Sequence, residues 1–147
     1  MTHEKNLYDI PVKLMKHFTN GITHNLILWI ISKETIHGYG IMKKLEEFFS
    51  FQDSKCDINI NSSKIYPILS KMEKNGLVIG EWNVNENNKR VKYYSITDDG
   101  LAVLKHIQNT WTHVLENPAW VEFIEDMTQR EINDEKRNWN SWSYKSL

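Results

Sequence analysis

The sequence predicts a mainly α-helical protein that carries one small β-hairpin, which places it in the α+β class. Apolar residues recur at helical spacing through most of the chain. Near the middle, two short β-rich runs flank a polar loop. With 147 residues, 40% of them hydrophobic, the chain is also long enough to bury a core.

Residues 62–76 form the most distinct predicted helix. Four apolar residues recur at i, i+3, i+4 and i+7 and make one buried stripe: Ile65, Ile68, Leu69 and Met72. Ser62 or Ser63 is expected to cap the start, and Asn75-Gly76 to end the helix in a left-handed conformation. The lysines of this segment fall largely on the side away from the stripe.

Residues 77–82 and 89–96 are the two β-rich runs, and the polar residues 83–88 join them as a hairpin. Strand alternation turns either Tyr93 or Tyr94 toward the core and divides the cations between the two faces. A helix followed by a basic hairpin is the arrangement of a winged helix-turn-helix. There the helix enters a major groove of DNA and the hairpin reaches the backbone or the minor groove.

Four segments, in this order, resemble the signature blocks of the PadR family of bacterial and archaeal winged-helix transcription factors: residues 37–45, 65–69, 75–78 and 92–100. The resemblance covers residues 22–107. It implies a repressor that binds double-stranded DNA at a palindromic operator, as a homodimer held by helices that flank the winged-helix domain. Ser63 and Lys64 stand where family members usually have Gly-Thr, so the operator sequence does not follow from the resemblance.

The candidate DNA-binding residues are the cations and hydroxyl-bearing side chains of these segments: Tyr39, Ser62, Ser63, Lys64, Tyr66, Lys71, Lys89, Arg90 and Lys92. Lys64 opposes the helix dipole at a helix start, which suits a position where a phosphate or a guanine edge arrives. The resemblance implies that His37 shapes a turn and that Tyr39 lies near the DNA backbone. A place for Tyr39 in the core is equally open.

The predicted organisation has four parts. Residues 1–21 form an N-terminal extension whose helix ends near Asn20-Gly21, and residues 22–100 form the DNA-binding domain. Its first helix, residues 22–32, is expected to be buried, with Trp29 packed in the core. The second helix of this domain follows the turn at residues 37–40, and Phe48 is expected on its inner, core-facing side. Residues 51–61 form a polar connection in which Ile58 and Ile60 alternate like a short edge strand.

Residues 101–137 are predicted to form dimerisation helices, and residues 138–147 a loosely ordered tail. A seam with spacings of three, four and three precedes a break at residues 115–118, and a second helical run covers 119–137. The candidate interface combines both: Leu104, Ile107, Trp111, Val114, Ile124 and Met127. Trp111 and Trp120 could line an interface pocket for a planar aromatic effector, the alternative being a filled core.

The net charge of −1 conceals an uneven distribution. Residues 62–94 hold six Lys/Arg against three Asp/Glu, whereas residues 120–147 hold four against six. The basic region favours DNA. The alternatives are an ordinary charged surface, or a winged helix that contacts proteins through its acidic segment, residues 122–135.

Other classes of protein find no support in the sequence. The chain has a single cysteine, Cys56, and no His, Cys or carboxylate residues at metal-ligand spacing. It has no glycine-rich phosphate loop or nucleophile motif, so neither an enzyme nor a cofactor is expected. It has no apolar run long enough to span a membrane and no signal-peptide pattern at its start. We therefore expect a cytoplasmic protein.

Overall fold

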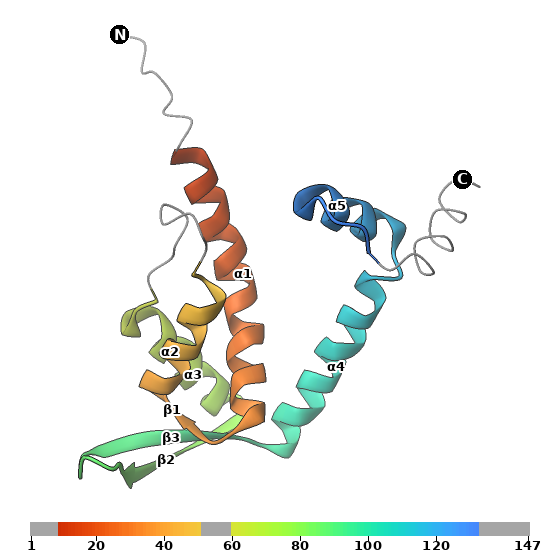
Figure 1. Ribbon diagram of the computed structural model, residues 1–147. Helices are drawn as coiled ribbons and strands as arrows, with labels where there is room; N and C mark the ends of the chain where they lie inside the picture. The colour runs from red at the N-terminus through yellow and green to blue at the C-terminus, as the bar shows by residue number, and fades with distance from the viewer. Residues whose placement is uncertain (1–8, 51–59, 133–147) are drawn as a thin grey trace. The chain divides into compact units, whose positions relative to one another are not determined.

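The computed structural model describes residues 9–50 and 60–132, except for the side chains of residues 9–13. Contacts divide the chain into two compact units, residues 1–104 and 105–147. The elements are, in order, α1 (Asp9–Lys33), β1 (Ile36–His37), α2 (Gly38–Phe48), α3 (Ser62–Lys74), β2 (Val78–Val84), β3 (Arg90–Ile96), α4 (Asp98–Val114) and α5 (Pro118–Thr128) (Figure 1). The predicted α+β class and the helix-then-hairpin order are confirmed.

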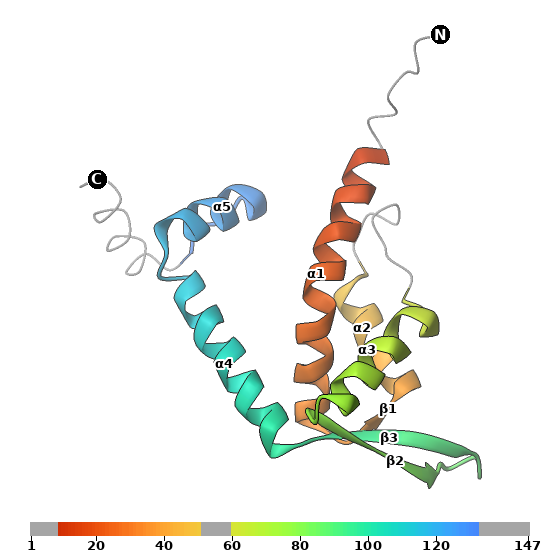
Figure 2. The ribbon, with the colours of Figure 1, turned by 180° about the vertical axis from the view of Figure 1, so that it is seen from behind.

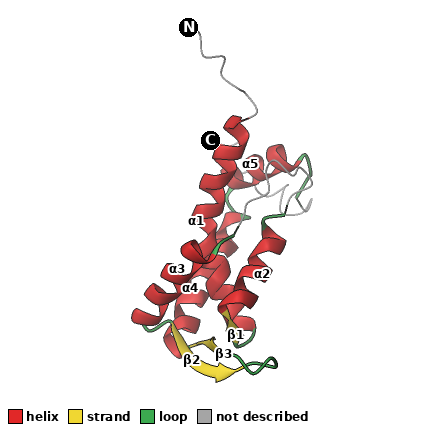
Figure 3. Ribbon diagram, turned by 90° about the vertical axis from the view of Figure 1, so that its left-hand side faces the viewer, coloured by secondary structure: helices red, strands yellow, loops and turns green. Residues whose placement is uncertain are grey.

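The three strands form one antiparallel sheet in the order β1-β3-β2 (Figure 3). Tyr94 is the centre of this sheet, because it pairs with Ile36 of β1 on one side and Gly80 of β2 on the other. The hairpin was predicted, but its third strand was expected at Ile58 and Ile60. Ile58 lies outside the described residues and Ile60 is in no strand, and β1 takes that place instead.

The core of the first unit is built from one face of each of three helices. α1 packs against α2 and β3, while α3 packs against α2 and β2. Figure 2 shows α2 and α3 beside the same stretch of α1, above the strands. The buried side chains include the whole predicted stripe of α3: Ile27, Ile30 and Ile31 from α1, Ile41 and Leu45 from α2, and Ile65, Ile68, Leu69 and Met72 from α3. Burial of this stripe fixes which face of α3 is left to solvent.

α1 is one continuous helix of 25 residues, so the predicted helix end at Asn20-Gly21 is wrong. A glycine inside a helix costs only about 1 kcal/mol, which tertiary packing on either side of it overrides. Thr19 and Thr23 are buried on either side of Gly21. Their hydroxyls donate to the carbonyls of Met15 and Thr19 within the helix, so neither polar group is left without a partner.

Trp29 was expected in the core, but its side chain is 40% exposed. Its ring meets that of Phe48, also expected to face inward, edge to face at 6.0 Å between centroids, and Phe48 is likewise exposed. The ammonium of Lys33 lies 5.3 Å from the centre of the indole. The apolar run of α1 covers more of the helix surface than the core can take, so these two aromatic residues pair at its edge.

Side chains next to α3 set both of its ends. The predicted caps, Ser62 and Ser63, are already helical, and Asn61 is the N-cap instead, accepting from the backbone N–H of Lys64 at 3.1 Å. Asn has the same capping chemistry as Ser, so only the position differs. The predicted left-handed stop is confirmed at Gly76, with φ of 75°.

Thr97 joins the end of α3 to the beginning of α4. Its hydroxyl donates to the carbonyl of Gly76 at 2.6 Å and accepts from the N–H of Gly100 at 3.0 Å. Its own N–H donates to the carbonyl of Leu77 at 3.1 Å. Thr97 therefore caps α4, and the same residue connects the first turn of α4 to the turn after α3.

In the second unit α5 begins at Pro118, with the side chain of Asn117 accepting from the N–H of Ala119 at 3.0 Å. It ends at Thr128, because Gln129 adopts a left-handed conformation with φ of 55°. The helix was predicted to continue to residue 137. This is wrong for residues 129–132, which follow the end of α5. The rest of that range, the predicted tail and most of the connection with Cys56 lie outside the described residues.

Glycine at position 100 is required by a close approach, which gives a test of this packing. A Cβ there would collide with the carbonyl of Leu77, whereas a Cβ at Gly21 would meet nothing within 4 Å. We expect Gly100→Ala to destabilise the fold by about 1–3 kcal/mol. Gly21→Ala should instead stabilise it by roughly 0.5–1 kcal/mol. Urea unfolding followed by circular dichroism distinguishes them, and equal effects would contradict this packing.

Candidate nucleic-acid interface

One face of α3 is exposed along its whole length. Ser63, Pro67, Ser70 and Lys74 recur at i, i+4, i+7 and i+11, opposite the buried stripe, and all four are exposed. Lys71 is exposed beside them. We call these five residues the α3 ridge. Ser70 and Lys74 were not among the predicted contacts, although the helical spacing of the apolar residues already indicated their positions.

Lys64 lies on one flank of α3, the side on which Lys71 borders the ridge. Its ammonium donates to the side-chain oxygen of Asn20 in α1, and its side chain is partly buried. Lys71 lies on the same side of the helix, two turns after Lys64. Tyr66 and Glu73 lie on the opposite flank. The two flanks therefore differ: one carries lysines, and the other faces the hairpin.

The β2–β3 hairpin, which we call the wing, carries Lys89 and Arg90 near its tip, both exposed. The guanidinium carbon of Arg90 lies 5.3 Å from the centre of the Trp82 ring on the neighbouring strand. The loop between the strands is ordered by Asn85, whose side chain accepts from the N–H groups of Asn87 and Lys89 at 3.0 and 2.9 Å. Lys89 and Arg90 therefore follow a loop whose conformation is held by hydrogen bonds.

Lys92 connects the wing to α3. Its ammonium lies 2.8 Å from a carboxylate oxygen of Glu73, and this hydrogen bond raises the pKa of Lys92 above its ordinary value. The side chain lies across Gly80 of the neighbouring strand, where a Cβ would collide with it. Of the predicted DNA contacts, Lys92 is therefore one whose charge already has an acidic partner.

The start of α2 is formed by His37 and Tyr39. The Nδ1 atom of His37 accepts from the N–H of Gly40 at 2.8 Å and caps the helix, which agrees with its expected role in a turn. Tyr39 is 60% exposed, so the alternative that placed it in the core is wrong. The ammonium of Lys43 lies 5.4 Å from the centre of its ring. Tyr39 is thus at the surface with a cation beside it.

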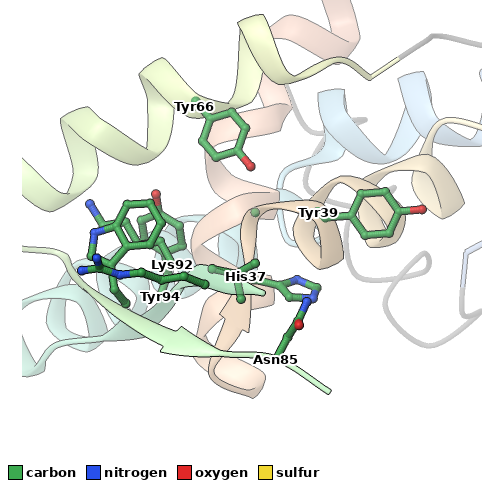
Figure 4. A pocket seen from close by; sticks show the side chains of 10 residues that line it. His37, Tyr39, Tyr66, Asn85, Lys92 and Tyr94 are labelled. Atoms are coloured by element: carbon green, nitrogen blue, oxygen red, sulfur yellow. The ribbon is translucent and has the colours of Figure 1, made fainter. Parts of the chain in front are cut away.

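A groove with a volume of about 490 Å³ lies between the start of α2, the flank of α3 and the wing. Its lining combines aromatic rings with two cations: His37, Gly38, Tyr39, Tyr66, Trp82, Asn85, Arg90, Val91, Lys92 and Tyr94. Figure 4 shows Tyr66 pointing from α3 into this space, with Lys92 and Tyr94 on the wing side. The Tyr66 ring lies so close to Gly38 that a Cβ there would collide with it.

The arrangement is that of a winged helix, and comparison with known proteins agrees. The model of the transcriptional regulator PadR-like family matches residues 27–106, more than half of the chain. The protein belongs to the PadR-like family. This is a family of transcriptional regulators and not a class of enzymes, and the predicted resemblance is confirmed.

Solved structures of PadR-like regulators are similar in sequence and fold. A PadR family transcriptional regulator from Eggerthella lenta is 31% identical, covering 73% of this chain and 86% of its own, with a TM-score of 0.59. A PadR-like transcriptional regulator from Bacillus cereus is 29% identical over 78% of this chain and 99% of its own, with a TM-score of 0.58. No curated protein sequence matches the chain.

The structure brings together only part of the predicted site of this PadR-like regulator. Tyr39, Tyr66, Arg90 and Lys92 line one groove, Lys89 stands at the wing tip, Ser62 and Ser63 open α3, and Lys64 faces α1. Sequence reasoning missed Trp82, which is 58% exposed. Alternation along β2 was the available signal, because it places Trp82 on the same face as the buried Val78.

The predicted dimerisation residues lie on α4 and α5. Leu104 is buried, Ile107, Val114 and Ile124 are partly buried, and Trp111 and Met127 are exposed. Trp120 is also exposed and packs edge to face on Phe123, with 6.0 Å between ring centroids. In the second unit, half of the side chains predicted to meet a partner or an effector are therefore open to solvent, and the other half are partly buried.

Within the part of the chain that the structure describes, no group of three or more His, Cys, Asp or Glu side chains could hold a metal ion. None of the described helices is long and apolar enough to cross a membrane.

Tyr94 provides a test of the packing beneath the groove. Burial raises its pKa above the ordinary 10.0, although the charge of Lys92 opposes this. Above pH 10 the unfolded chain therefore ionises first, and the stability contributed by the neutral phenol is lost as the pH rises. We expect Tyr94→Phe to lose less stability than the native protein between about pH 9 and 11. Urea unfolding across this range measures the difference, and parallel pH profiles would contradict the assignment.

Proposed function

We propose that this PadR-like regulator is a repressor that binds a palindromic operator as a homodimer. The α3 ridge would enter the major groove, and the wing would reach the adjoining backbone or minor groove. The observation that carries the proposal is the exposed polar and cationic surface of α3 and of the wing, on either side of one groove in a winged-helix fold. Charged and hydroxyl side chains in that position contact phosphates and base edges.

The predicted contacts take different parts in this proposal. Ser62, Ser63, Lys71 and the additional Lys74 would meet DNA from α3, with Tyr66 at the edge of the groove. Tyr39 would donate to a phosphate at the start of α2, and Lys89 and Arg90 would bind from the wing. Lys64 would reach DNA by exchanging Asn20 for a phosphate or a base. Lys92, held by Glu73, would chiefly position the wing.

Homodimerisation through α4 and α5 is supported by their apolar surface. Within the second unit the exposed apolar side chains are Trp111, Leu115, Trp120, Phe123 and Met127. An apolar surface of this composition on helices of seventeen and eleven residues is typical of a protein–protein contact. A second copy of the chain carries the same surface and can bury it in a symmetric dimer. Ile107, Val114 and Ile124 would complete the interface at its partly buried edge, whereas the predicted interface residue Leu104 is buried in the single chain.

We further propose that Trp111 and Trp120 admit a planar aromatic effector where two copies meet. Both indoles are about half exposed in the single chain, which supports a site that closes only on dimerisation. Indole faces stack on planar or cationic molecules. Titration of Trp111→Phe and Trp120→Phe with planar aromatic compounds tests this by fluorescence. If no compound both quenches these tryptophans and alters DNA affinity, the residues only pack.

The dimer is tested by placing a charge on the seam. Ile107→Asp should yield a monomer in sedimentation velocity at micromolar concentration and weaken operator binding, because a palindromic site needs both half-site readers. Asn109→Asp adds the same charge to an exposed polar position of α4 and should leave the dimer intact. A native protein that sediments as a monomer would disprove this part of the proposal.

The wing contact is tested through salt dependence. Arg90→Ala should weaken binding to all sequences alike and lower the slope of log affinity against log salt by about one. Lys44→Ala removes a cation that is paired with Glu34 at 2.7 Å and should leave the slope unchanged. Fluorescence anisotropy of a labelled duplex over a range of salt measures both, and identical slopes would refute the contact at Arg90.

Genomic binding profiling tests the function as a whole and identifies the operator. Enrichment of a palindromic sequence upstream of genes whose transcription rises on deletion would support a repressor. An absence of enriched DNA would instead favour the second candidate, a winged helix that contacts proteins through α5, where Glu122 and Asp126 are exposed.

A further inference from the structure

We propose that the groove between α3 and the wing holds one sugar–phosphate strand of DNA, with Trp82 as its apolar contact and Arg90 as its phosphate contact. The inference rests on the proposed DNA binding and adds to it a residue and a mode of contact. In this arrangement Trp82 packs on the deoxyribose face of the strand. The wing then binds through an apolar surface as well as through charge.

The placement follows from the geometry of duplex DNA. A helix in the major groove and a hairpin at the adjoining minor groove are separated by the one backbone strand that divides these grooves. The groove of about 490 Å³ lies between these two elements, and its walls are Tyr66 on α3 and Trp82 and Arg90 on the wing. A strand that passes between α3 and the wing must therefore lie along these side chains.

Trp82 is the large apolar side chain of this wall. It is 58% exposed and lies on the groove face of β2, opposite Lys92 in the strand register. Exposed indoles bury apolar area readily against a sugar or a base, whose flat faces are poorly hydrated. Ile79 is similarly exposed, at 50%, but alternation places it on the other face of β2. Only one of these two side chains can thus meet a strand in the groove.

Arg90 complements Trp82 because stacking and hydrogen bonding use different parts of a guanidinium. Its guanidinium carbon lies over the indole, 5.3 Å from the ring centre. The N–H groups point outward in the plane and can donate to phosphate oxygens. The contact therefore keeps these donors beside the indole, where the phosphate next to a packed sugar would lie.

The ion pair between Lys92 and Glu73 sets the width of the groove. It joins the wing to the flank of α3 at 2.8 Å, and Lys92 pairs with Trp82 in the strand register, so the ion pair lies at the level of Trp82 and one register step of two residues from Arg90. The glycine at position 80 leaves the space that the Lys92 side chain crosses. The two walls are thus connected before any ligand arrives, which reduces the ordering that binding requires.

Charge favours a polymer over a small anion as the occupant. Cations continue beyond the groove in two directions, to Lys71 and Lys74 on the α3 ridge and to Lys89 at the wing tip, all exposed. A small aromatic anion would meet only Arg90 and Lys92. A duplex would use the whole series, since its phosphates repeat along the strand.

The test measures the affinity of the full chain for a random-sequence duplex of about 30 base pairs, which spans two half-sites a helical turn apart. Because a backbone contact does not depend on sequence, random DNA at low salt is sufficient. We expect Trp82→Ala to lose about tenfold in affinity with the salt slope unchanged. Trp82→Phe should recover part of the loss, and Ile79→Ala, the matched control, should bind within about twofold of the native protein.

The possible outcomes separate this inference from the function on which it rests. If the native protein binds the duplex and Trp82→Ala binds equally well, the groove assignment is overturned while DNA binding stands. An equal loss in Ile79→Ala would also overturn it, because the effect would then be one of wing folding. Unchanged DNA affinity in Trp82→Ala, with benzoate quenching seen only in the native protein, would assign the groove to a small anion. Failure of the native protein to bind any duplex would refute both proposals.

Discussion

Burial of one face of α3 is the constraint on which the rest of the DNA-binding unit depends. Ile65 and Leu69 are completely buried in a helix that packs against α2 and β2, and this fixes the rotation of the helix about its axis. The exposed ridge, the lysine flank and the flank beside the wing are consequences of that single rotation. A change of the buried stripe would therefore alter every surface that α3 presents, whatever its polar residues were.

Features set by local spacing could be predicted from the sequence. The α3 stripe follows from apolar residues at i, i+3, i+4 and i+7, and the hairpin from two β-rich runs with a polar loop. The left-handed stop at Gly76 and the cap at Thr97 depend on residue types with strong conformational preferences. In each case the information lies within a few residues of the structure it determines.

Features set by distant partners could not be predicted. Two residues of β1 become a strand only because the edge of β3 beside Tyr93 and Tyr94 is open to them. The continuation of α1 through Gly21 depends on packing on both sides of that residue, and the exposure of Trp29 on how much of the helix the core covers. The same limit applied to the site. Lys64 and Lys92 look alike in sequence, yet Asn20 and Glu73, far from them along the chain, give their charges different surroundings.

The bridge between the wing and α3 has a consequence for how such sequences can diverge. Three positions form this bridge. Glu73 supplies the negative charge and Lys92 the positive charge, and the absence of a side chain at Gly80 leaves space for the Lys92 side chain to reach Glu73. A substitution at any one of these positions breaks the bridge and removes the reason for the other two residues. The three positions should therefore change together or not at all among close homologues. By contrast, Pro67, Ser70, Lys71 and Lys74 of the α3 ridge have no such bridge to another element of the described fold, so they can change one at a time and alter the preferred operator without disturbing the scaffold.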